Sequence, residues 1–343
     1  MSRRLPAEWE RQSAVLLAWP HEDTDWSPWL DAVEAVYAEL AAVISRRQRL
    51  LILCRESHHR RDILSRLHAS GAAEERLVLH AVPYDDTWVR DYGPITVLEK
   101  GRPRLLDFTF NGWGGKYPAA RDNAVNQRLH AAGVLGRAPL ETVNLVLEGG
   151  SIESDGAGTL LTTRRCLLHP QRNPGRDQSQ LEAALCRHLG AGRVLWLEHG
   201  EILGDDTDGH IDMLVRFCGQ DTLAYACCND PADEHYGPLR LMEEELKCLR
   251  TKRGRPYRLA PLPLPAPVHD EQGRRLPASH ANFLVINGAV LMPAYDDPAD
   301  ETARRTLQAC FPGHSIHPVH ATPLIRQHGS IHCVTMQLPA GVL

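Results

Sequence analysis

The chain has 343 residues, 43% of them hydrophobic, which is enough to bury a large core in one large domain or in two. Its net charge of −5, with no block of Lys or Arg along the chain, argues against a nucleic-acid-binding surface. Nine cysteines without a small-scaffold spacing suit a reducing compartment, and neither a signal peptide nor a membrane-spanning run is visible. We therefore expect a soluble, cytoplasmic protein.

Short apolar runs alternate with helical patterns at the beginning of the chain. Ser27-Pro28 provides an N-cap and an N1 proline for a helix whose apolar residues, from Leu30 to Ile44, recur at helical spacing. A second helix is expected at Ser57–His68. The predicted strands here are Ser13–Trp19, Leu50–Cys54 and Leu77–Val82.

The same alternation continues to the last residues. Pro261–Pro267 is rich in proline and is expected to be an extended linker within the fold. The predicted helices are Gln178–Leu189, Tyr236–Leu249 and one that Asp297-Pro298 caps and that runs to about Cys310. The predicted strands are Leu105–Phe110, Leu145–Ile152, Thr159–Leu161, Val194–Leu197, Met213–Cys218, Thr222–Ala226, Phe283–Ile286, Ala289–Met292 and Ser330–Gln337.

An acidic stretch, residues 204–213, is the most unusual part of the sequence. Three carboxylates lie in a loop bounded by glycines, and His210 and Asp212 follow at the start of an apolar run. Residues two apart on a strand point the same way, so His210 and Asp212 would share a face. A loop this acidic is favoured when it binds a cation, either a metal or an organic one, although a solvated turn explains any single Asp.

Polar residues recur at the edges of the predicted strands, about 50 to 70 residues apart, a spacing typical of repeated supersecondary units. No Gly-rich phosphate loop accompanies them, which disfavours a doubly wound nucleotide-binding fold. Repeated units closing around a centre would bring these residues into one pocket. The residues concerned are Asp91, Glu148, His210, Asp212, Asn282 and Cys333.

Three of these residues have simple structural explanations. A lone cysteine such as Cys333 is most often a buried structural residue, and Asp91 could pair with the neighbouring Arg90. Glu148 ends an apolar strand, where an acid is usually buried and partnered. For catalysis, Cys333 would need a base, which His210 can supply, and a cation that lowers its pKa.

Eight motifs together are similar to agmatine deiminase and its relatives, the bacterial peptidylarginine-deiminase-like branch of the guanidino-group-modifying enzymes. They occur in family order from near the first residue to near the last, so the resemblance covers nearly the whole chain. The motifs are Pro6–Glu10, Trp88–Pro94, Asn111–Tyr117, Glu148–Glu153, Asn173-Pro174, Gly204–Asp212, Asn282–Gly288 and Ser330–Cys333.

The resemblance implies an α/β fold, a five-bladed pseudo-symmetric propeller (pentein) with a central active site, in one catalytic domain over residues 1–343. Cys333 would be the nucleophile, His210 the general acid/base and Glu148 the residue that orients that histidine. Asp91 and Asp212 would hold the guanidinium, because its planar fork of N–H donors fits carboxylates. Asp206 and Trp88 match positions that line the pocket for the rest of the substrate.

The implied reaction is hydrolysis of agmatine to N-carbamoylputrescine and ammonia, a step of putrescine biosynthesis, through an amidino-cysteine intermediate. It needs no cofactor and no metal, since the organic cation satisfies the acidic stretch. A small guanidino compound is the expected partner, with no nucleic acid or membrane, and the oligomeric state stays open, a homo-oligomer included. Two alternatives remain: deimination of free or peptidyl arginine to citrulline, and a non-catalytic guanidinium- or polyamine-binding protein.

The sequence departs from the family pattern at three places. Arg326-Gln327-His328 stands where a glycine run usually precedes the nucleophile, and it could narrow or repolarise the approach to Cys333. Met213 replaces a small polar residue and His280 an aromatic one. Asp206 and Trp88 attract a cation and do not suit a carboxylate, so we expect agmatine to be preferred over arginine unless Arg326 turns inward.

Overall fold

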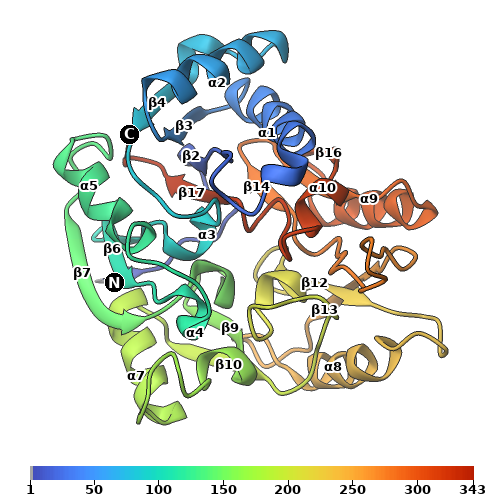
Figure 1. The fold of residues 1–343 in the computed structure, drawn as a ribbon. Coiled ribbons are helices and arrows are strands. Elements are labelled where there is room, and N and C mark those ends of the chain that lie inside the picture. The colour runs from blue at the N-terminus through green and yellow to red at the C-terminus, as the bar shows by residue number, and fades with distance from the viewer. Residues whose placement is uncertain (1–2) are drawn as a thin grey trace.

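The computed structural model describes residues 3–343, which form a mixed α/β fold with several small sheets (Figure 1). Two of these sheets have the strand orders β1-β5-β6-β7 and β17-β2-β3-β4, and three-stranded sheets have the orders β10-β9-β8, β11-β12-β13 and β14-β15-β16. The strands of the first two sheets are β1 (Arg3–Arg4), β5 (Ile95–Glu99), β6 (Arg102–Thr109), β7 (Leu140–Val146), β17 (Thr335–Pro339), β2 (Gln12–Ala18), β3 (Arg49–Cys54) and β4 (Leu77–Ala81). Those of the other three are β10 (Arg193–Leu197), β9 (Thr159–Thr163), β8 (Glu153–Ser154), β11 (Val215–Phe217), β12 (Thr222–Cys227), β13 (Arg258–Pro263), β14 (Leu284–Ile286), β15 (Ala289–Ala294) and β16 (Ser315–His320).

The helices lie mainly on the outside, with the strands toward the centre of the view in Figure 1. The longer helices are α1 (Leu30–Ser45), α2 (Ser57–Ala69), α5 (Val125–Ala131), α7 (Gln178–Leu189), α8 (Tyr236–Cys248) and α9 (Pro298–Cys310). The short ones are α3 (Val89–Tyr92), α4 (Gly112–Gly115), α6 (Arg164–Leu167) and α10 (Thr322–Ile325). Single 3-10 turns are η1 (Ser27–Trp29), η2 (Glu74–Arg76), η3 (Asp122–Ala124), η4 (Gly149–Ser151) and η5 (Ile211–Met213). No helix within residues 3–343 has the length and apolar character needed to cross a membrane.

All five sheets repeat one pattern. An antiparallel pair is followed by a parallel third strand, as in β5-β6 and β6-β7 or in β14-β15 and β15-β16. A helix precedes that third strand, for example α7 before β10 and α9 before β16. The sheet that contains β17 uses both ends of the chain, because β17 pairs antiparallel with β2 and β2 pairs parallel with β3. The sequence-predicted recurrence of strand–helix units is therefore present in the structure.

Local sequence explains the clearest boundaries. Asp177 forms a capping box with Gln180 at the start of α7, and the helix ends at Gly190, whose positive φ of 69° suits glycine. Asp297 caps α9 ahead of Pro298 at the first helical position. The apolar residues of β2 and β3 are buried in the main core. The sequence predicted these helices within a residue or two.

Several strand predictions were wrong. Cys333 lies in a turn before β17, and His210 precedes η5, so His210 and Asp212 do not share a face of a strand. The proline-rich segment was expected to be a linker, but its first residues belong to β13 at the edge of its sheet, where a missing N–H is tolerated. Strands β5 and β16 were not predicted. For β5, β13 and β16, pairing with a neighbouring strand, and not the local sequence, decides the conformation.

Candidate active site

The site residues predicted from the sequence come together from turns next to four different sheets. Asp91 is in α3, Glu148 immediately precedes η4, and His210 and Asp212 flank the start of η5. Cys333 lies in the turn that leads into β17. All five side chains are buried. The short connections at the strand ends therefore position these five side chains, and the sheets hold the connections in place.

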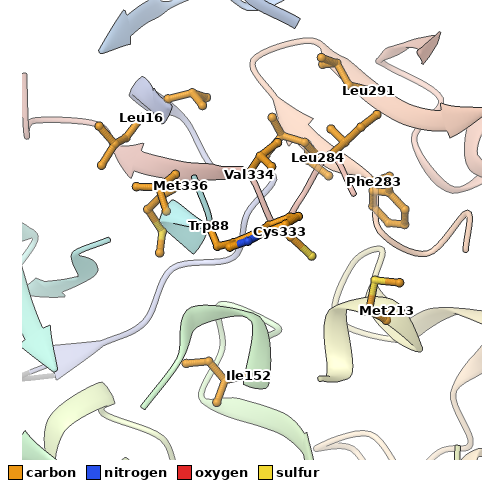
Figure 2. Close-up of a cluster of buried hydrophobic side chains, with 14 of the residues drawn as sticks. Leu16, Trp88, Ile152, Met213, Phe283, Leu284, Leu291, Cys333, Val334 and Met336 are labelled. Atoms are coloured by element: carbon orange, nitrogen blue, oxygen red, sulfur yellow. The ribbon is translucent and has the colours of Figure 1, made fainter. Parts of the chain in front are cut away.

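Cys333 lies within the apolar core, and Figure 2 draws it with Trp88, Val334 and Phe283 in a cluster of buried side chains. Two polar groups reach its sulfur. Asn282 Nδ2 lies 3.2 Å from Sγ, and Asp212 Oδ2 lies 3.7 Å away. Burial, and then the charges of Asp212 and Asp91, raise the pKa of the Cys333 thiol well above its usual value. The thiol is therefore protonated until a cation joins the two carboxylates.

His210 is fixed by Glu148. Its Nε2 lies 2.8 Å from Glu148 Oε2, while Nδ1 lies 3.6 Å from Asp91 Oδ1 and has no hydrogen-bond partner among the described residues. Burial alone would lower the pKa of His210, but the charge of Asp91, the neighbouring Cys166 and the hydrogen bond to Glu148 raise it well above its usual value. At neutral pH the imidazole is therefore protonated, with its Nδ1–H pointing away from Glu148.

Asp91 and Asp212 are held in different ways. Asp91 accepts hydrogen bonds from the Gly150 N–H and the Trp113 indole, both at 2.9 Å, and burial raises its pKa to about 6. Asp212 Oδ2 accepts a 2.8 Å hydrogen bond from His332, while Oδ1 is buried without a partner among residues 3–343. Burial would raise the pKa of Asp212, but the hydrogen bond and charge of His332 lower it.

Gly150 lets three of these side chains approach its backbone closely. A Cβ atom at this position would lie 2.6 Å from His210 Nδ1, 2.9 Å from Asp91 Oδ1 and 3.0 Å from Asp212 Oδ2, too close for any residue larger than glycine. The three side chains therefore converge on one point of the backbone. Two neighbouring carboxylates have the charge and the acceptor geometry that a planar guanidinium requires.

A cavity leads from Cys333 and Asp91 toward the surface. Trp88 and Asp206 line it, and so do Gln327 and His328 of the unusual segment before Cys333. Its other lining residues are Asp25, Asp86, Trp113, Tyr117, Thr207 and Gly329. Asp206 accepts a 2.9 Å hydrogen bond from the Tyr117 hydroxyl.

Arg326 does not line this cavity. Its guanidinium lies 2.6 Å from Glu271 and over the ring of Trp29. Within residues 3–343 the cavity lining contains carboxylates but no lysine or arginine. The charge of the cavity lining is therefore complementary to a substrate tail that carries a cation.

Two groups of side chains have the composition of metal ligands, Glu148 with Cys166 and His210, and Glu8 with Glu153 and His332. In the first, Arg172 Nε lies 3.0 Å from both oxygens of Glu148. In the second, Arg216 hydrogen-bonds both glutamates. Each carboxylate cluster is thus already matched by a guanidinium, which supplies the positive charge that a metal would bring.

Several residues of the site carried no sequence signal of their own. Arg172, His332, Trp113 and Gly150 lie inside or beside motifs quoted above, but their partners are 20 to 120 residues away, so no spacing indicates the contacts. Asn282 was recognised as a polar residue at a strand edge, without its contact to the thiol. In the acidic stretch, Asp208 pairs with Arg172, a contact that the sequence did not indicate.

Comparison with known proteins gives relatives over the full length. Agmatine deiminases of Stutzerimonas stutzeri and Pseudomonas aeruginosa are each 33% identical, over 98% of this chain and 95% of theirs. The solved C. jejuni agmatine deiminase with substrate bound is 38% identical, with a TM-score of 0.91 over 99% of this chain and 97% of that one. A Porphyromonas gingivalis structure, named provisionally as an arginine deiminase, is 46% identical with a TM-score of 0.93, covering 99% of each chain.

The family model that matches describes the Porphyromonas-type peptidyl-arginine deiminases, and the match covers residues 4–339. That range includes all seven residues that the sequence proposed for the site. The chain therefore belongs to the Porphyromonas-type peptidyl-arginine deiminase family.

Proposed function

We propose that this protein is an agmatine deiminase, which hydrolyses agmatine to N-carbamoylputrescine and ammonia through a covalent amidino-cysteine intermediate. The observation that carries the proposal is that His210, Asp91 and Asp212 converge at Gly150, with Asp212 beside the thiol of Cys333 and with Cys333 and Asp91 lining the cavity. Two buried polar atoms of these side chains, His210 Nδ1 and Asp212 Oδ1, have no partner within the described residues. A bound guanidinium and its departing nitrogen would satisfy both.

Asp91 and Asp212 bind the guanidinium. Their four oxygens accept from its N–H fork, which fixes its plane and offsets the loss of water. The cation also neutralises the two charges that keep Cys333 protonated, so binding itself lowers the thiol pKa. The thiol releases its proton to solvent as the substrate binds, and the resulting thiolate attacks the central carbon of the guanidinium.

His210 then transfers protons. Its imidazolium gives the Nδ1 proton to the departing nitrogen, and ammonia leaves from the tetrahedral adduct. The neutral ring next accepts a proton from water, which attacks the amidino-thioether carbon. The C–S bond breaks, the thiol is restored and the ureido product leaves. Glu148 keeps the imidazole oriented and favours its charged form throughout.

The cavity supports agmatine over arginine. Agmatine ends in an ammonium, for which Asp206 is an anion and Trp88 an aromatic face. Arginine adds a carboxylate, and Arg326, the basic residue that could have received it, is paired with Glu271. Lys116 is engaged with Asp208. A carboxylate in this cavity meets like charge without a cationic partner, which costs about 2 kcal/mol or more.

We further propose that the five repeated sheets are the blades of a single-domain, five-bladed pseudo-symmetric propeller over residues 1–343 with the site at its centre. The recurrent antiparallel–parallel pattern supports this arrangement. The nine cysteines, all free, support the cytoplasm as its location.

The test is a panel of guanidino compounds in which ammonia and the ureido product are both quantified. Agmatine should exceed free arginine in kcat/KM by about 100-fold, and Asp206→Asn should narrow that ratio by weakening agmatine. Comparable values for the two substrates would point to arginine deimination. Turnover of neither, with tight binding of both, would identify a binding protein.

A further inference from the structure

We propose that Arg172 is a positioning residue for the acid–base step, which aligns the Glu148 carboxylate and links it to the acidic loop 205–209 at the mouth of the site. This inference rests on the proposed deiminase function and adds a residue to it.

Arg172 uses its whole guanidinium within the protein. Nε lies 3.0 Å from Oε1 and 3.0 Å from Oε2 of Glu148, Nη1 lies 2.7 Å from Asp208 Oδ2, and Nη2 donates to the Thr207 carbonyl at 2.7 Å. Only 1% of the Arg172 side chain is exposed and none of that of Glu148, so water does not replace these bonds. A buried ion pair with this many hydrogen bonds fixes geometry more firmly than a surface pair.

Glu148 has few other restraints. Its remaining polar contacts are His210 Nε2 at 2.8 Å and the thiol of Cys166 at 3.8 Å. Burial would raise the pKa of Glu148, but its bond to His210 and the charge of Arg172 lower it. Without the guanidinium, the carboxylate could rotate, or take up a proton, and either change would release the imidazole that it orients.

The backbone holds Arg172 in register with Glu148. The side chain of the next residue, Asn173, accepts from the Val146 N–H at 3.1 Å and donates to the Val146 carbonyl at 2.8 Å. Val146 is the last residue of β7, two positions before Glu148. Asn173 thus joins the Arg172 loop to the strand end that carries the catalytic carboxylate.

The acidic loop 205–209 is also held by contacts that do not involve Arg172, so the effect of Arg172 on Glu148 can be separated from an effect on the loop. Asp205 accepts from the N–H and hydroxyl of Thr207 and from the Gly209 N–H. Lys116 reaches Asp208 Oδ1 at 2.9 Å and the Asp206 carbonyl from the other side. Lys116 touches neither Glu148 nor His210, so it is the matched control for Arg172.

The experiment compares steady-state kinetics of Arg172→Gln, Arg172→Lys and Lys116→Met with agmatine. Arg172→Gln should lower kcat by about 100-fold, the lower end of what a positioned acid–base group contributes. Arg172→Lys keeps the charge but loses the fork, and should lower kcat by about tenfold. KM should change by less than about threefold in both, because Arg172 does not line the cavity. Lys116→Met should leave kcat within about twofold of the wild type.

Asp208→Asn provides a milder variant if the buried substitutions do not fold. It weakens the outer anchor of Arg172 on a partly exposed side chain, and should lower kcat by about threefold to tenfold with KM unchanged. An unaltered kcat in every folded Arg172 and Asp208 variant, or a loss confined to KM, overturns the inference. Wild-type protein is measured in the same assay, and failure of wild type to release ammonia would overturn the deiminase function instead.

Discussion

Asp91 and Asp212, the two carboxylates whose charges act on Cys333, occupy contrasting surroundings. Asp91 is held by neutral donors, the Gly150 N–H and the Trp113 indole, and its pKa is raised by burial. Asp212 is held by an ionic chain, in which His332 Nδ1 lies 2.8 Å from Asp212 and Nε2 lies 2.8 Å from Glu8. Asp212 therefore stays charged, whereas the charge of Asp91 depends on pH and ligand. The site thus combines one permanent anion with one that a bound cation must stabilise.

The largest expected effect is a loss of turnover without a loss of binding when Cys333, which lies beside Asp212, is replaced. Cys333→Ser should lower turnover by about 10⁴-fold or more, because a hydroxyl is a much poorer nucleophile. Both carboxylates remain, so the Kd for agmatine by calorimetry should stay within about threefold. Cys228→Ser is the control, since Cys228 is also buried but its thiol contacts the Asp230 carbonyl and does not line the cavity, and it should keep near-native activity. Near-native activity of Cys333→Ser would remove it from the mechanism.

Asparagine substitutions compare the two carboxylates directly. Asp212→Asn should reduce kcat/KM by about 10³-fold, because it leaves His332 and Arg216 with one fewer anion in a buried cluster. Asp91→Asn should reduce kcat/KM by about 10²-fold, since the neutral donors around Asp91 lose less hydrogen-bond energy when the charge is removed. Asp208→Asn should cost less than either. A larger loss for Asp91→Asn than for Asp212→Asn, in parallel assays at neutral pH, would mean that Asp212 is not the more important anion of the two.

Gly150→Ala tests whether activity needs the close approach of Asp91, Asp212 and His210 to the backbone of Gly150. The new methyl group would clash with His210, Asp91 and Asp212 at once, and kcat/KM should fall by about 100-fold. Gly237→Ala is the control, because a Cβ there meets nothing within 4 Å. Circular dichroism verifies that both variants are folded, and an active Gly150→Ala enzyme would mean that the guanidinium binds elsewhere.

The smallest effect is the pH dependence of Asp91. Its ionised form binds the cation, and its pKa of about 6 in the free protein means that affinity is complete above this pH and is lost as pH falls through it. We expect kcat/KM to decline about tenfold per pH unit below about 6. The acid limb of the kcat profile should lie at a lower pH than that of kcat/KM, because the bound cation stabilises the charged carboxylate.

Trp113→Phe sharpens this measurement. The indole N–H lowers the pKa of Asp91, so its loss should move the acid limb of kcat/KM to higher pH. Profiles recorded for both proteins under the same buffer conditions decide it. An unshifted limb in the variant would assign the titration to another group.

The sequence indicated the helices and the identity of the clustered polar residues better than it indicated their contacts. Capping boxes and helical spacing are local, which is why α7 and α9 were predicted closely. The partners of Glu148 and Asp212, by contrast, are Arg172 and His332, brought together only by the packing of separate sheets. The strand expected for His210 and Asp212 failed for a related reason, since a 3-10 turn replaces it where the chain bends into the site.

The pairing of β17 with β2 has a consequence for folding of the chain during its synthesis. Strand β2 ends at residue 18 and its antiparallel partner β17 begins at residue 335, so roughly 300 residues are made between the two strands. Synthesis of these residues takes on the order of half a minute at typical rates. During that time the edge of β2 that later pairs with β17 lacks its partner strand, and an unpaired strand edge is a template for aggregation. The growing chain must therefore keep this edge covered until β17 has been made and has docked.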